Sequence, residues 1–593
     1  MYRSFRLLSL IWLLCITCLF GQKVVKSDSN VAIFNNLSSE NIYVHYNSSL
    51  LFSGEYLYYK VYCLSSAKTR LSDVSKIAYL EIIDSDYSTV LKQKIVLTNG
   101  SGQGDIFIPV SIPSGQYKII CYTNWMQNFE INFFEGTLNI LNPYQVGEAN
   151  KNFEEIKDTL VSNQSVEYFL DSEQSGKEIV LNLDKDKYES REEVYLNILS
   201  DGLSNPEGDY SISVINQDDI LNYFPQSFRD FTNSKEMSEN KVLKKNIKDS
   251  ISLPELRGEI LSGRVVINND KPKENLAGKK ILLTFPGHQY NIGLATTNTK
   301  GEFYINIHEL QHNEELYVRE LGYKNNQNIL MDFTNKINIG KIVFDTLRIT
   351  STAKAALLQR SVYNQIDNAY NSIRPDSTMV INEISNFYGE DFENYNLENY
   401  SRFETLKETI VEIIEHVWFK VIEEDKIILQ VDIKNDTYRS VNLLPMVIID
   451  GMPVSDHTKL LNLKAAIIET INVVRKKYYF GSQIFQGIVD IKTFDGNYYK
   501  DFATEYDIKK PFITTTIPKR YYNQTYTEKT RQQLARIPDF RSQLLWMPEL
   551  NLKAGVNEIR FFTSDRKGKF IISLEGLTKK GEVISLRKSF EVK

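Results

Sequence analysis

The stretch Leu444–Phe494, LPMVIIDGMPVSDHTKLLNLKAAIIETINVVRKKYYFGSQIFQGIVDIKTF, decides the fold in the middle of the chain. Gly and Pro mark a turn at Asp450–Pro453, and Phe480–Ser482 marks a second turn. Around these turns lie three apolar, β-branched runs typical of buried strands: Met446–Ile449, Ile467–Val474 and Ile488–Ile491. The spacing predicts a compact β-α-β-β unit whose short helix is Lys459–Ala466.

Three segments of this stretch, VIIDGMPV, IIETINVVRK and YYFGSQIFQGIVDIKT, resemble the plug domain of TonB-dependent outer-membrane receptors. That family has a strand ending in Asp-Gly-x-Pro, a strand Ile-Glu-x-Ile-x-Val-x-Arg/Lys, and two glycines before Ile/Val-x-Ile-x-Thr. The matching positions are Asp450, Gly451, Pro453, Glu469, Ile471, Val473, Arg475, Gly481, Gly487, Ile491 and Thr493. The resemblance implies a small α+β plug-like domain, which we place with flanking helices at residues 350–500. The alternative is an unrelated α/β subdomain.

A plug of that family lies inside a barrel of about 22 strands, and each strand needs about 9–11 residues to cross the bilayer. Only Asp495–Lys593 follow the plug-like stretch, and these residues are too few for such a barrel. No run of short amphipathic strands precedes the stretch either. The sequence therefore predicts a plug-like domain without a transporter around it, which acts by contact with an outer-membrane protein partner.

The N-terminus, MYRSFRLLSLIWLLCITCLFGQ, has the pattern of a secretory signal peptide. Arg3 and Arg6 precede the apolar run Leu7–Phe20, and the small residue Gly21 fits a cleavage point. We assign residues 1–21 to the signal. No other apolar run reaches the ~18 residues that a membrane-spanning helix needs, so we expect no transmembrane segment after signal removal. With the plug resemblance, export implies the periplasm or the outer membrane of a Gram-negative bacterium.

The cysteines agree with export. If Cys15 and Cys18 leave with the signal, only Cys63 and Cys121 remain, and both lie in strand-like runs. A disulfide between them, across neighbouring strands, would stabilise the fold by roughly 4 kcal/mol in the chain-entropy model. The alternative is two buried free thiols.

Residues 41–141 alternate strand-like runs with clusters of Gly, Asn, Ser and Pro. The segments GEYLYYKVY, NGSGQGDIFIP and PSGQYKIICYTNW resemble the macroglobulin-like domain of bacterial relatives of alpha-2-macroglobulin, which implies a β-sandwich at 30–145. A weak internal repeat predicts a second such sandwich at 160–226. Its matched positions are Val44, Ser53, Glu55, Leu57, Tyr58 and Val61, which recur as Leu181, Ser190, Glu192, Val194, Tyr195 and Ile198. The charged stretch 227–252 predicts a linker or mobile loop.

The segments GEILSGRVVINNDKP, LAGKKILLTFPG and ATTNTKGEFYINI resemble the carboxypeptidase regulatory-like domain, which implies a prealbumin-like sandwich at 255–346. Apolar spacing predicts helices at Ala353–Tyr370 and at Arg402–Val417. Ser401 and Glu404 fit a capping box for the second helix, and we expect the pair to support the plug-like domain. The tail alternates strands and turns and predicts a C-terminal β-sandwich at 520–593.

The pentapeptide His308-Glu309-Leu310-Gln311-His312 matches the HExxH zinc pattern. That chemistry needs a helix, because two His residues four positions apart face one metal only on a helix. Here the pentapeptide lies between strand-like runs, Phe303–Ile307 and Leu316–Val318. We therefore reject His308, Glu309 and His312 as a metal site and expect no cofactor. The Cys-Gly-Glu-Gln thioester of covalent macroglobulin traps is also absent from the sequence.

The mild net charge of −6 gives no basis for nucleic-acid binding, and an aromatic content of 12% suits sheets. The sequence predicts a mainly β, multidomain chain: tandem macroglobulin-like sandwiches, a prealbumin-like sandwich, a small α+β plug-like domain and a C-terminal sandwich. Its predicted function is that of a non-enzymatic exported interaction or scaffold protein of the outer-membrane envelope. The alternatives are a glycan- or peptide-binding accessory module and a macroglobulin-like, non-covalent endopeptidase inhibitor.

Overall fold

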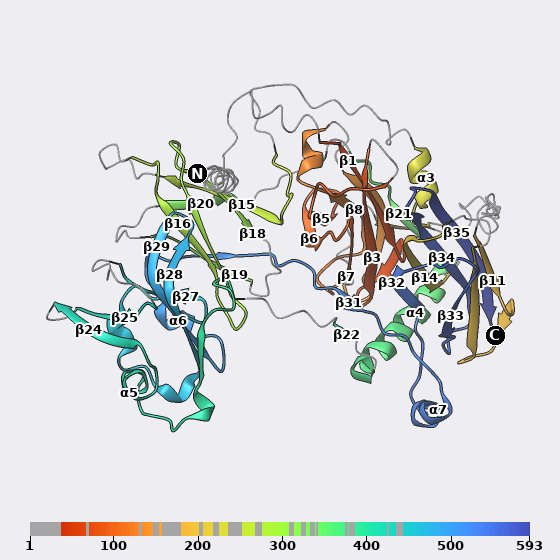
Figure 1. The fold of residues 1–593 in the computed structure, drawn as a ribbon. Helices are drawn as coiled ribbons and strands as arrows, with labels where there is room; N and C mark the ends of the chain where they lie inside the picture. Colours follow the sequence, from red (N-terminus) through yellow and green to blue (C-terminus); the bar gives the residue numbers. More distant parts are fainter. Residues whose placement is uncertain are drawn as a thin grey trace, which may run out of the picture.

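The structure, a computed structural model, is mainly β, as the sequence predicts, and its sheets form two lobes (Figure 1). One lobe holds the first and second sandwiches. The other holds a third sandwich and a unit that we call the hairpin unit, residues 386–502. The described residues are 37–66, 70–129, 133–145, 153–156, 179–200, 205–217, 224–234, 252–266, 275–307, 314–321, 328–332, 339, 342–373, 377–378, 386–423, 426–434 and 443–593. Among them, no helix combines the length and the apolar character needed to span a membrane.

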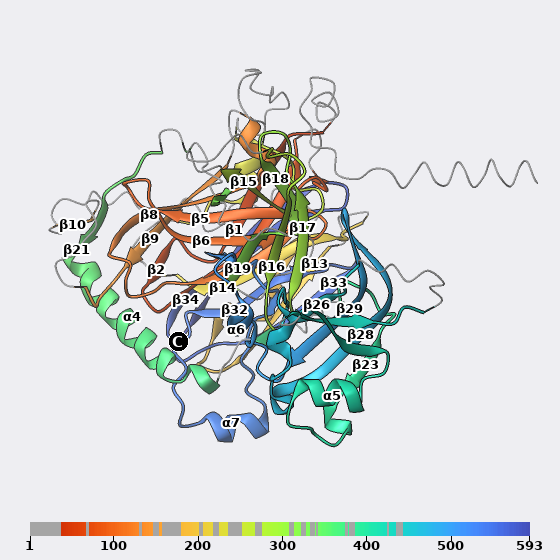
Figure 2. The same ribbon diagram turned by 90° about the vertical axis from the view of Figure 1, so that its left-hand side faces the viewer.

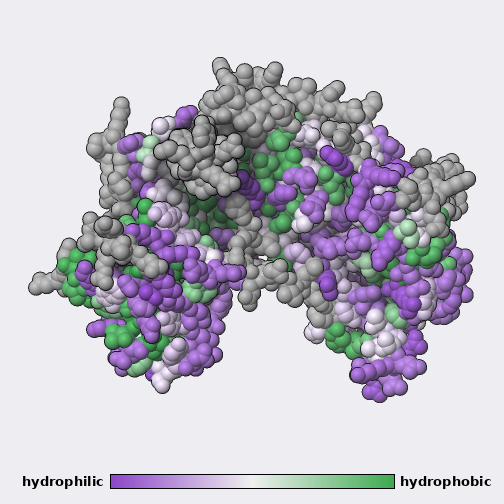
Figure 3. All heavy atoms as spheres, in the orientation of Figure 1, coloured by the Kyte–Doolittle hydropathy of each residue, from purple (hydrophilic) through white to green (hydrophobic). Residues whose placement is uncertain are grey.

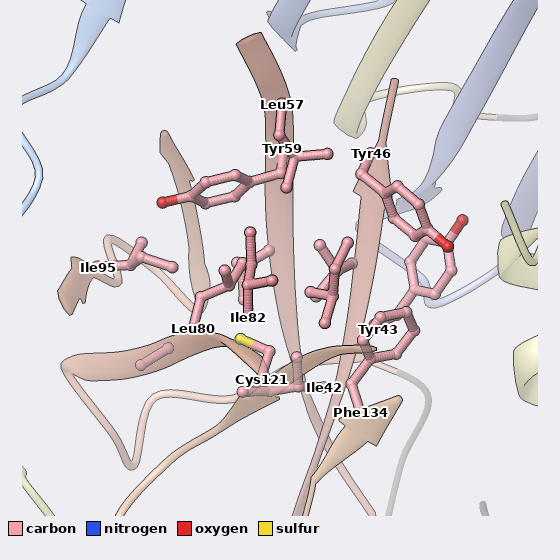
Figure 4. Packing of buried hydrophobic residues seen from close by; sticks show 14 of the residues in the cluster. Ile42, Tyr43, Tyr46, Leu57, Tyr59, Leu80, Ile82, Ile95, Cys121 and Phe134 are labelled. Carbon is pink, nitrogen blue, oxygen red and sulfur yellow. The ribbon is translucent and has the colours of Figure 1, made fainter. Parts of the chain in front are cut away.

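The first sandwich packs two sheets face to face. One sheet contains β1 (Glu40–Tyr46), β3 (Tyr56–Ser65), β4 (Arg70–Leu71) and β7 (Ser101–Phe107). The other has the order β2 (Leu50–Phe52), β9 (Phe134–Leu141), β8 (Gly115–Tyr122), β5 (Ile77–Ile83) and β6 (Thr89–Val96), and the short helix η1 (Trp125–Asn128) follows β8. Figure 4 shows Cys121 among aliphatic and aromatic side chains of this core. Cys63 lies on β3 in the opposite sheet, and both thiols are buried and free.

The second sandwich combines strands from two distant parts of the chain. One sheet has the order β11 (Val180–Leu183), β13 (Glu193–Leu199) and β33 (Val556–Phe562). The other has the order β12 (Lys187–Tyr188), β35 (Val583–Val592), β34 (Gly568–Thr578), β14 (Gly208–Asn216) and β32 (Gln543–Leu550). The sequence predicts separate sandwiches at 160–226 and 520–593. The structure corrects this prediction, because neither segment has enough strands to cover its own apolar face and the two share one core.

The internal repeat has a structural counterpart. Val44 pairs with Val61 between β1 and β3, and the matched residues Leu181 and Ile198 pair in the same way between β11 and β13. The turns before β3 and β13 also correspond. Each has a left-handed residue, Gly54 or Arg191, followed by a glutamate. Glu55 Oε2 accepts from Phe52 N (2.9 Å), and Glu192 Oε2 accepts from Glu189 N (2.6 Å). The two sandwiches therefore begin with the same strand-turn-strand unit.

The predicted linker 227–252 begins with a helix, α3 (Phe228–Asn233), whose side chains Phe228 and Phe231 are buried. The Phe228 ring stacks on Tyr43 of β1 at 4.2 Å between ring centroids, so α3 belongs to the core of the first sandwich. The prediction of a linker is wrong for these residues, because two aromatic side chains one helical turn apart outweigh the surrounding charge. Residues 235–251 lie outside the described residues.

The third sandwich also takes a strand from outside its predicted range of 255–346. One sheet has the order β18 (Glu302–Ile307), β15 (Glu259–Val266) and β20 (Asn328–Asp332). The other has the order β17 (Asn291–Thr296), β16 (Lys280–Phe285), β19 (Glu315–Glu320) and β30 (Ile508–Pro511). Because β30 follows the hairpin unit in sequence, the chain leaves that unit by crossing back over the third sandwich.

The helix predicted at Ala353–Tyr370 is present as α4 (Ser351–Ala369), but it does not support the predicted plug-like domain. It runs along the first sandwich (Figure 2), where Arg360 Nη2 donates to Glu55 Oε2 at 2.7 Å and Asn364 Nδ2 donates to the Ser53 carbonyl at 2.9 Å. The expected support is therefore wrong for this helix. The elements that lie outside the three sandwiches and the hairpin unit are β10 (Phe153–Ile156), β21 (Leu347–Thr350), η4 (Asn371–Ile373), β22 (Ser377–Thr378), β31 (Lys519–Arg520) and α7 (Glu528–Leu534).

Buried polar contacts join the two lobes. Lys94 of β6 forms an ion pair with Glu259 of β15 at 2.6 Å, and its ammonium lies 3.9 Å from the centroid of the Phe512 ring. Beside this pair, Tyr79 Oη donates to Glu255 Oε1 at 2.9 Å. Thr516 N donates to the Lys94 carbonyl at 2.7 Å, which ties the returning chain to the same edge.

The hairpin unit is built on one sheet with the order β23 (Glu393–Asn396), β28 (Ile468–Phe480), β29 (Gln483–Thr493), β26 (Met446–Ile449) and β27 (Met452–Pro453). A separate two-stranded sheet joins β24 (Val417–Glu423) and β25 (Lys426–Val431). The helices are α5 (Leu406–Glu412), α6 (Tyr499–Phe502), η5 (Leu397–Asn399), η6 (His457–Leu460) and η7 (Ala465–Ile467). Two helix predictions need correction here. The short helix Lys459–Ala466 is replaced by η6 and η7, and the long helix Arg402–Val417 shrinks to α5, with Thr405 and Glu408 as its capping box.

Candidate functional site

The Asp-Gly turn that follows β26 is fixed by the Asp450 side chain. Asp450 is 1% exposed and has a left-handed backbone, with φ of 45°. Its carboxylate accepts three hydrogen bonds: from Thr493 N (2.8 Å), Thr493 Oγ1 (2.7 Å) and Tyr498 N (2.9 Å). The first and last positions of the plug pattern therefore meet in space, and they hold the turn to the end of β29.

Gly451 brings this turn against the third sandwich. Its φ is 85°, and a Cβ added to it would lie 2.4 Å from the Cβ of Tyr290. Gly287 N donates to the Asp450 carbonyl at 2.9 Å across the same contact. A side chain at position 451 would push the two units apart, so this glycine is required by a close approach as well as by its backbone angle.

We expect Gly451→Ala to lower the free energy of unfolding of this lobe by about 2–3 kcal/mol, from backbone strain and overpacking together. Gly389→Ala is the matched control, because Gly389 has a similar φ of 82° but no atom within 4 Å of an added Cβ. Gly389→Ala should lower the free energy of unfolding only by the backbone strain of a left-handed alanine, about 1–2 kcal/mol. Urea unfolding of both variants measures the difference. Equal losses would show that Tyr290 does not press on the turn.

The other positions of the plug pattern also have structural roles, with one exception. Gly487, with φ of 84°, lies beside a register shift between Val474 and Lys477, and its added Cβ would meet the Val474 carbonyl oxygen at 2.6 Å. Gly481 forms the tip of the β28–β29 hairpin. The Pro453 carbonyl accepts from Arg319 Nη2 at 2.6 Å. Arg475 donates to Glu393 Oε1 (3.1 Å) and to the Asp432 carbonyl (3.0 Å). Glu469 is the exception, because it lines a pocket.

This pocket, with a volume of about 380 Å³, lies between the third sandwich and the hairpin unit. We call it the sheet pocket. The third sandwich contributes His288, Gln289 and Tyr290. The segment before β28 contributes Asn386, Phe387, Phe392 and Asn394. The β28–β29 hairpin contributes Glu469, Thr470, Asn472 and Lys492. The walls are therefore polar and rich in amides, with aromatic rings among them.

A buried hydrogen-bond network supports one wall of the sheet pocket. Asn394 Nδ2 donates to Asn472 Oδ1 (2.6 Å), and Asn472 Nδ2 donates to Tyr388 Oη (2.9 Å). The Tyr388 hydroxyl donates in turn to Asp490 Oδ2 at 2.7 Å. Asp490 is fully buried, and this burial raises its pKa. The network connects the pocket to a carboxylate in the interior of the unit.

The Tyr290 hydroxyl also faces this network, because hydrogen bonding to Asp490 and Tyr388 contributes to its raised pKa. Tyr290 is 8% exposed and Asp490 is 0% exposed. Burial first, and then the charge of Asp490, raises the pKa of the Tyr290 hydroxyl.

None of these residues is among the site residues predicted from the sequence, although the sequence contains a signal for them. Asn472 stands between Ile471 and Val473, and Asp490 stands between Val489 and Ile491. A polar residue inside an apolar, β-branched run places a polar group in a buried strand, where it needs a partner. The pairing of Asn472 opposite Asp490 in β28 and β29 brings the two signals together.

A second, smaller cavity of about 70 Å³ lies between the first and second sandwiches. His45 lines it, and its Nδ1 lies 2.6 Å from Ser211 Oγ, which also lies 2.9 Å from Tyr62 Oη. Burial lowers the pKa of His45 to about 3, so the ring is neutral near pH 7. Glu575, in the same wall, has a pKa raised to about 7 by burial. We assign this cluster to the contact between the two sandwiches, because its members are buried and come from both of them.

The residues of the rejected zinc pattern, His308, Glu309 and His312, lie outside the described residues. Within the described residues, no group of three or more His, Cys, Asp or Glu side chains is arranged to hold a metal ion.

No protein-family model and no curated protein matches this sequence. Among solved structures, the chain is similar to Salmonella alpha-2-macroglobulin reacted with methylamine, with 9% identity and a TM-score of 0.23 over 94% of this chain and 40% of that one. It is also similar to Escherichia coli alpha-2-macroglobulin activated by porcine elastase, with 8% identity and a TM-score of 0.23 over 93% and 44%. The chain thus spans less than half the length of these structures. A TM-score and a sequence identity this low carry no argument about function or residue roles. The resemblances to plug and regulatory-like domains stay predictions.

Proposed function

We propose that this protein is a non-enzymatic, exported scaffold of the outer-membrane envelope, and that the hairpin unit docks on an outer-membrane protein partner. The observation that supports this proposal is a group of exposed apolar side chains at the outer end of the unit. They are Val411 of α5 (68% exposed) and Trp418, Val421 and Ile422 of β24 (38%, 64% and 48%). Figure 3 shows hydrophobic surface over this end of the lobe. Apolar surface gathered in this way marks interaction sites on soluble proteins.

The shape of this surface favours an extended partner segment. In the described part of the chain β24 pairs only with β25, so the outer edge of β24 has no neighbouring strand there. The other edge of β25 packs against η6, where Leu429 N donates to His457 Nδ1 at 2.9 Å. A two-stranded sheet is marginally stable alone, and a strand added by a partner would stabilise it. The Trp418 side chain offers the aromatic anchor that interfaces commonly use.

The charge around the apolar side chains indicates a basic partner. Four exposed glutamates, Glu404, Glu408, Glu412 and Glu415, belong to the same segment as the apolar side chains, against three exposed basic residues, Arg402, Lys407 and Lys420. Complementary charges at an interface rim raise the association rate and select partners. We therefore commit to an extended, basic segment of an outer-membrane protein as the occupant.

Photo-cross-linking in intact cells tests the proposal. A photoreactive phenylalanine derivative at Val421 is expected to capture one outer-membrane protein, identified by mass spectrometry. Val556 of β33 is the matched control, because it is also a strand valine and is also 64% exposed. The cross-link should weaken when Glu408 and Glu412 are both replaced by lysine. Capture of the same protein from both positions, or of a protein outside the outer membrane, would contradict the proposal.

The sheet pocket favours a second candidate function, that of a module that binds a small polar ligand. It differs from docking in where the ligand lies, because the pocket faces the third sandwich while the apolar patch lies at the outer end of the unit.

A further inference from the structure

We propose that the sheet pocket binds a small zwitterion, an α-amino acid or a dipeptide, with Glu469 holding the ligand ammonium group and Lys492 the ligand carboxylate. The inference rests on the second candidate function, ligand binding in this pocket, and it names the class of ligand. It does not depend on the docking proposal, because the apolar patch is a different surface of the unit.

Glu469 reaches the pocket through an irregularity in the β28–β29 hairpin. Ile468 of β28 pairs with Thr493 of β29. The next pair joins Thr470 to Lys492, so Glu469 is an extra residue on β28 without an opposite residue on β29. Such a β-bulge re-aims a side chain, and bulges are common next to active sites. Here the extra residue lines the sheet pocket.

Glu469 and Lys492 have opposite charges and line the same pocket, but they do not pair with each other. The Glu469 carboxylate, which is half-buried, forms no hydrogen bond or ion pair with the described residues. Lys492 Nζ donates to Asn386 Oδ1 at 3.2 Å and lies 5.8 Å from the centroid of the Tyr290 ring. Because the two charged residues start from neighbouring positions on paired strands, one small molecule can reach both of them.

This pair of charges defines the ligand. A ligand ammonium group donates charge-assisted hydrogen bonds to Glu469, and a ligand carboxylate accepts them from Lys492. A ligand with only one of these groups would satisfy one side chain and be repelled by the other. A neutral ligand would satisfy neither charge. A zwitterion is therefore the class of small molecule that meets both.

The other titratable groups near the pocket agree with this assignment. Among the described residues that line the pocket, Glu469 is the only acid and Lys492 the only lysine or arginine. His288 lines it from the third sandwich and offers a further nitrogen donor to a ligand carboxylate. Asp490 is fully buried behind the wall, where the Tyr388 hydroxyl donates to it, so it does not compete with Glu469 for the ligand.

The walls suit an amino acid in chemistry and size. The side-chain amides of Gln289, Asn386 and Asn394 are of the kind that pairs with a peptide group or a carboxylate. The rings of Phe387 and Phe392 offer apolar surface to a ligand side chain. A volume of about 380 Å³ lies near the lower end of the range of roughly 300–1,000 Å³ that small-molecule pockets occupy. The pocket therefore fits one or two residues better than a longer peptide.

Ligand-observed saturation-transfer NMR with the full chain tests this proposal. The zwitterionic probes are leucine and the dipeptide Leu-Leu, and their relative affinity shows which of the two sources of this chemistry the pocket prefers. N-acetylleucine lacks the ammonium group, leucinamide lacks the carboxylate, and N-acetylleucinamide lacks both. We expect at least one zwitterion to bind, and its singly blocked derivatives to bind at least tenfold more weakly.

Two variants assign each charge of the ligand to its side chain. Glu469→Gln should weaken binding of the zwitterion at least tenfold and make it equal to that of the N-acetyl derivative. Lys492→Met should do the same with respect to the amide derivative. The unfolding midpoint of Glu469→Gln should stay unchanged, because the carboxylate has no partner in the described part of the chain. Glu398→Gln is the matched control, since Glu398 is an exposed glutamate of η5 that does not line the pocket, and it should bind as the unmodified chain does.

Three outcomes would overturn the proposal: neither zwitterion binds, a blocked derivative binds as tightly as its zwitterion, or Glu469→Gln leaves the affinity unchanged. A preference for N-acetylleucinamide would overturn the zwitterion and leave the second candidate function, binding of a small polar ligand, in place. The docking proposal is judged separately, because the cross-link at Val421 reports on the apolar patch.

Discussion

Replacing Asp450 by alanine is expected to lower the free energy of unfolding of the hairpin unit by about 3–5 kcal/mol. The buried carboxylate accepts from Thr493 N, Thr493 Oγ1 and Tyr498 N, and alanine leaves all three donors without a partner. Each unsatisfied buried donor costs about 1–3 kcal/mol, and entry of water into the space left by the side chain recovers part of the sum. The loss should be among the largest for any single substitution in this unit.

Two further variants separate the causes of this loss. Asp450→Asn keeps one acceptor oxygen and tolerates the left-handed backbone, so we expect an intermediate loss. Asp456→Ala is the control, because Asp456 is an exposed cap that accepts from Thr458 N at 3.1 Å. Loss of such a cap typically costs about 1 kcal/mol. Urea denaturation followed by tryptophan fluorescence measures all three, and an Asp450→Ala variant within 1 kcal/mol of the unmodified chain would contradict this account of the turn.

The strands around this turn could be predicted because their signal is local. The apolar runs of β26, β28 and β29 are bounded by Gly and Pro, so the strand pattern is visible in each run whatever covers it in the fold. The Asp450 network could be predicted only in part. The plug pattern contains both Asp450 and Thr493, but that their side chains meet follows from the parallel pairing of β26 with β29.

The start of α5 shows where local signals fail. Both Ser401-Arg-Phe-Glu404 and Thr405-Leu-Lys-Glu408 fit the capping-box pattern, and the sequence alone gives no reason to choose between them. The choice is made by distant residues. Arg402 Nη1 donates to the carbonyls of Ala465 (3.0 Å) and Ile468 (3.1 Å), and Leu406 N donates to the Leu463 carbonyl (2.7 Å). These bonds hold residues 402–405 outside the helix, so the helix begins after Thr405.

The second sandwich could not be predicted as one domain for a related reason. Apolar alternation in β13 and in β33 predicts two half-buried strands, but it does not say that Val194 pairs with Phe561 from the far end of the chain. The sheet pocket depends on a similar long-range contact, because it exists only where the third sandwich meets the hairpin unit.

The contact between the first and second sandwiches should respond to pH through Glu575. Its side chain is 1% exposed, and its Oε2 accepts from Phe228 N at 3.0 Å. Burial raises its pKa from 4.5 to about 7, against the opposing effect of Arg587. The folded protein therefore keeps a proton that the unfolded chain releases above about pH 4.5. The stability from this group is fully present below pH 4.5 and is lost as the pH rises through 7, by about 3 kcal/mol in total.

His45 has the opposite effect in an overlapping range. Its pKa falls from 6.5 to about 3, chiefly through burial, so the unfolded chain binds a proton that the folded protein does not. Its contribution is fully present above pH 6.5 and is lost as the pH falls through 3. Between about pH 4.5 and 6.5 the two groups change stability in opposite directions with similar slopes, so the unmodified chain should show little dependence on pH from this pair.

Glu575→Gln is therefore expected to reveal the His45 contribution. Glutamine still accepts from Phe228 N but does not titrate, so the variant should gain stability from about pH 3 to 6.5 and then level off. The difference in unfolding free energy, variant minus unmodified chain, should rise by about 3 kcal/mol between pH 4.5 and 8. Urea denaturation across this range measures it, and taking the difference cancels every other titrating group. His45→Gln should show the reverse, a stability that falls from pH 4.5 to 7. A constant difference for Glu575→Gln would show that this carboxylate titrates as it does in the unfolded chain, and that burial between the sandwiches does not hold its proton.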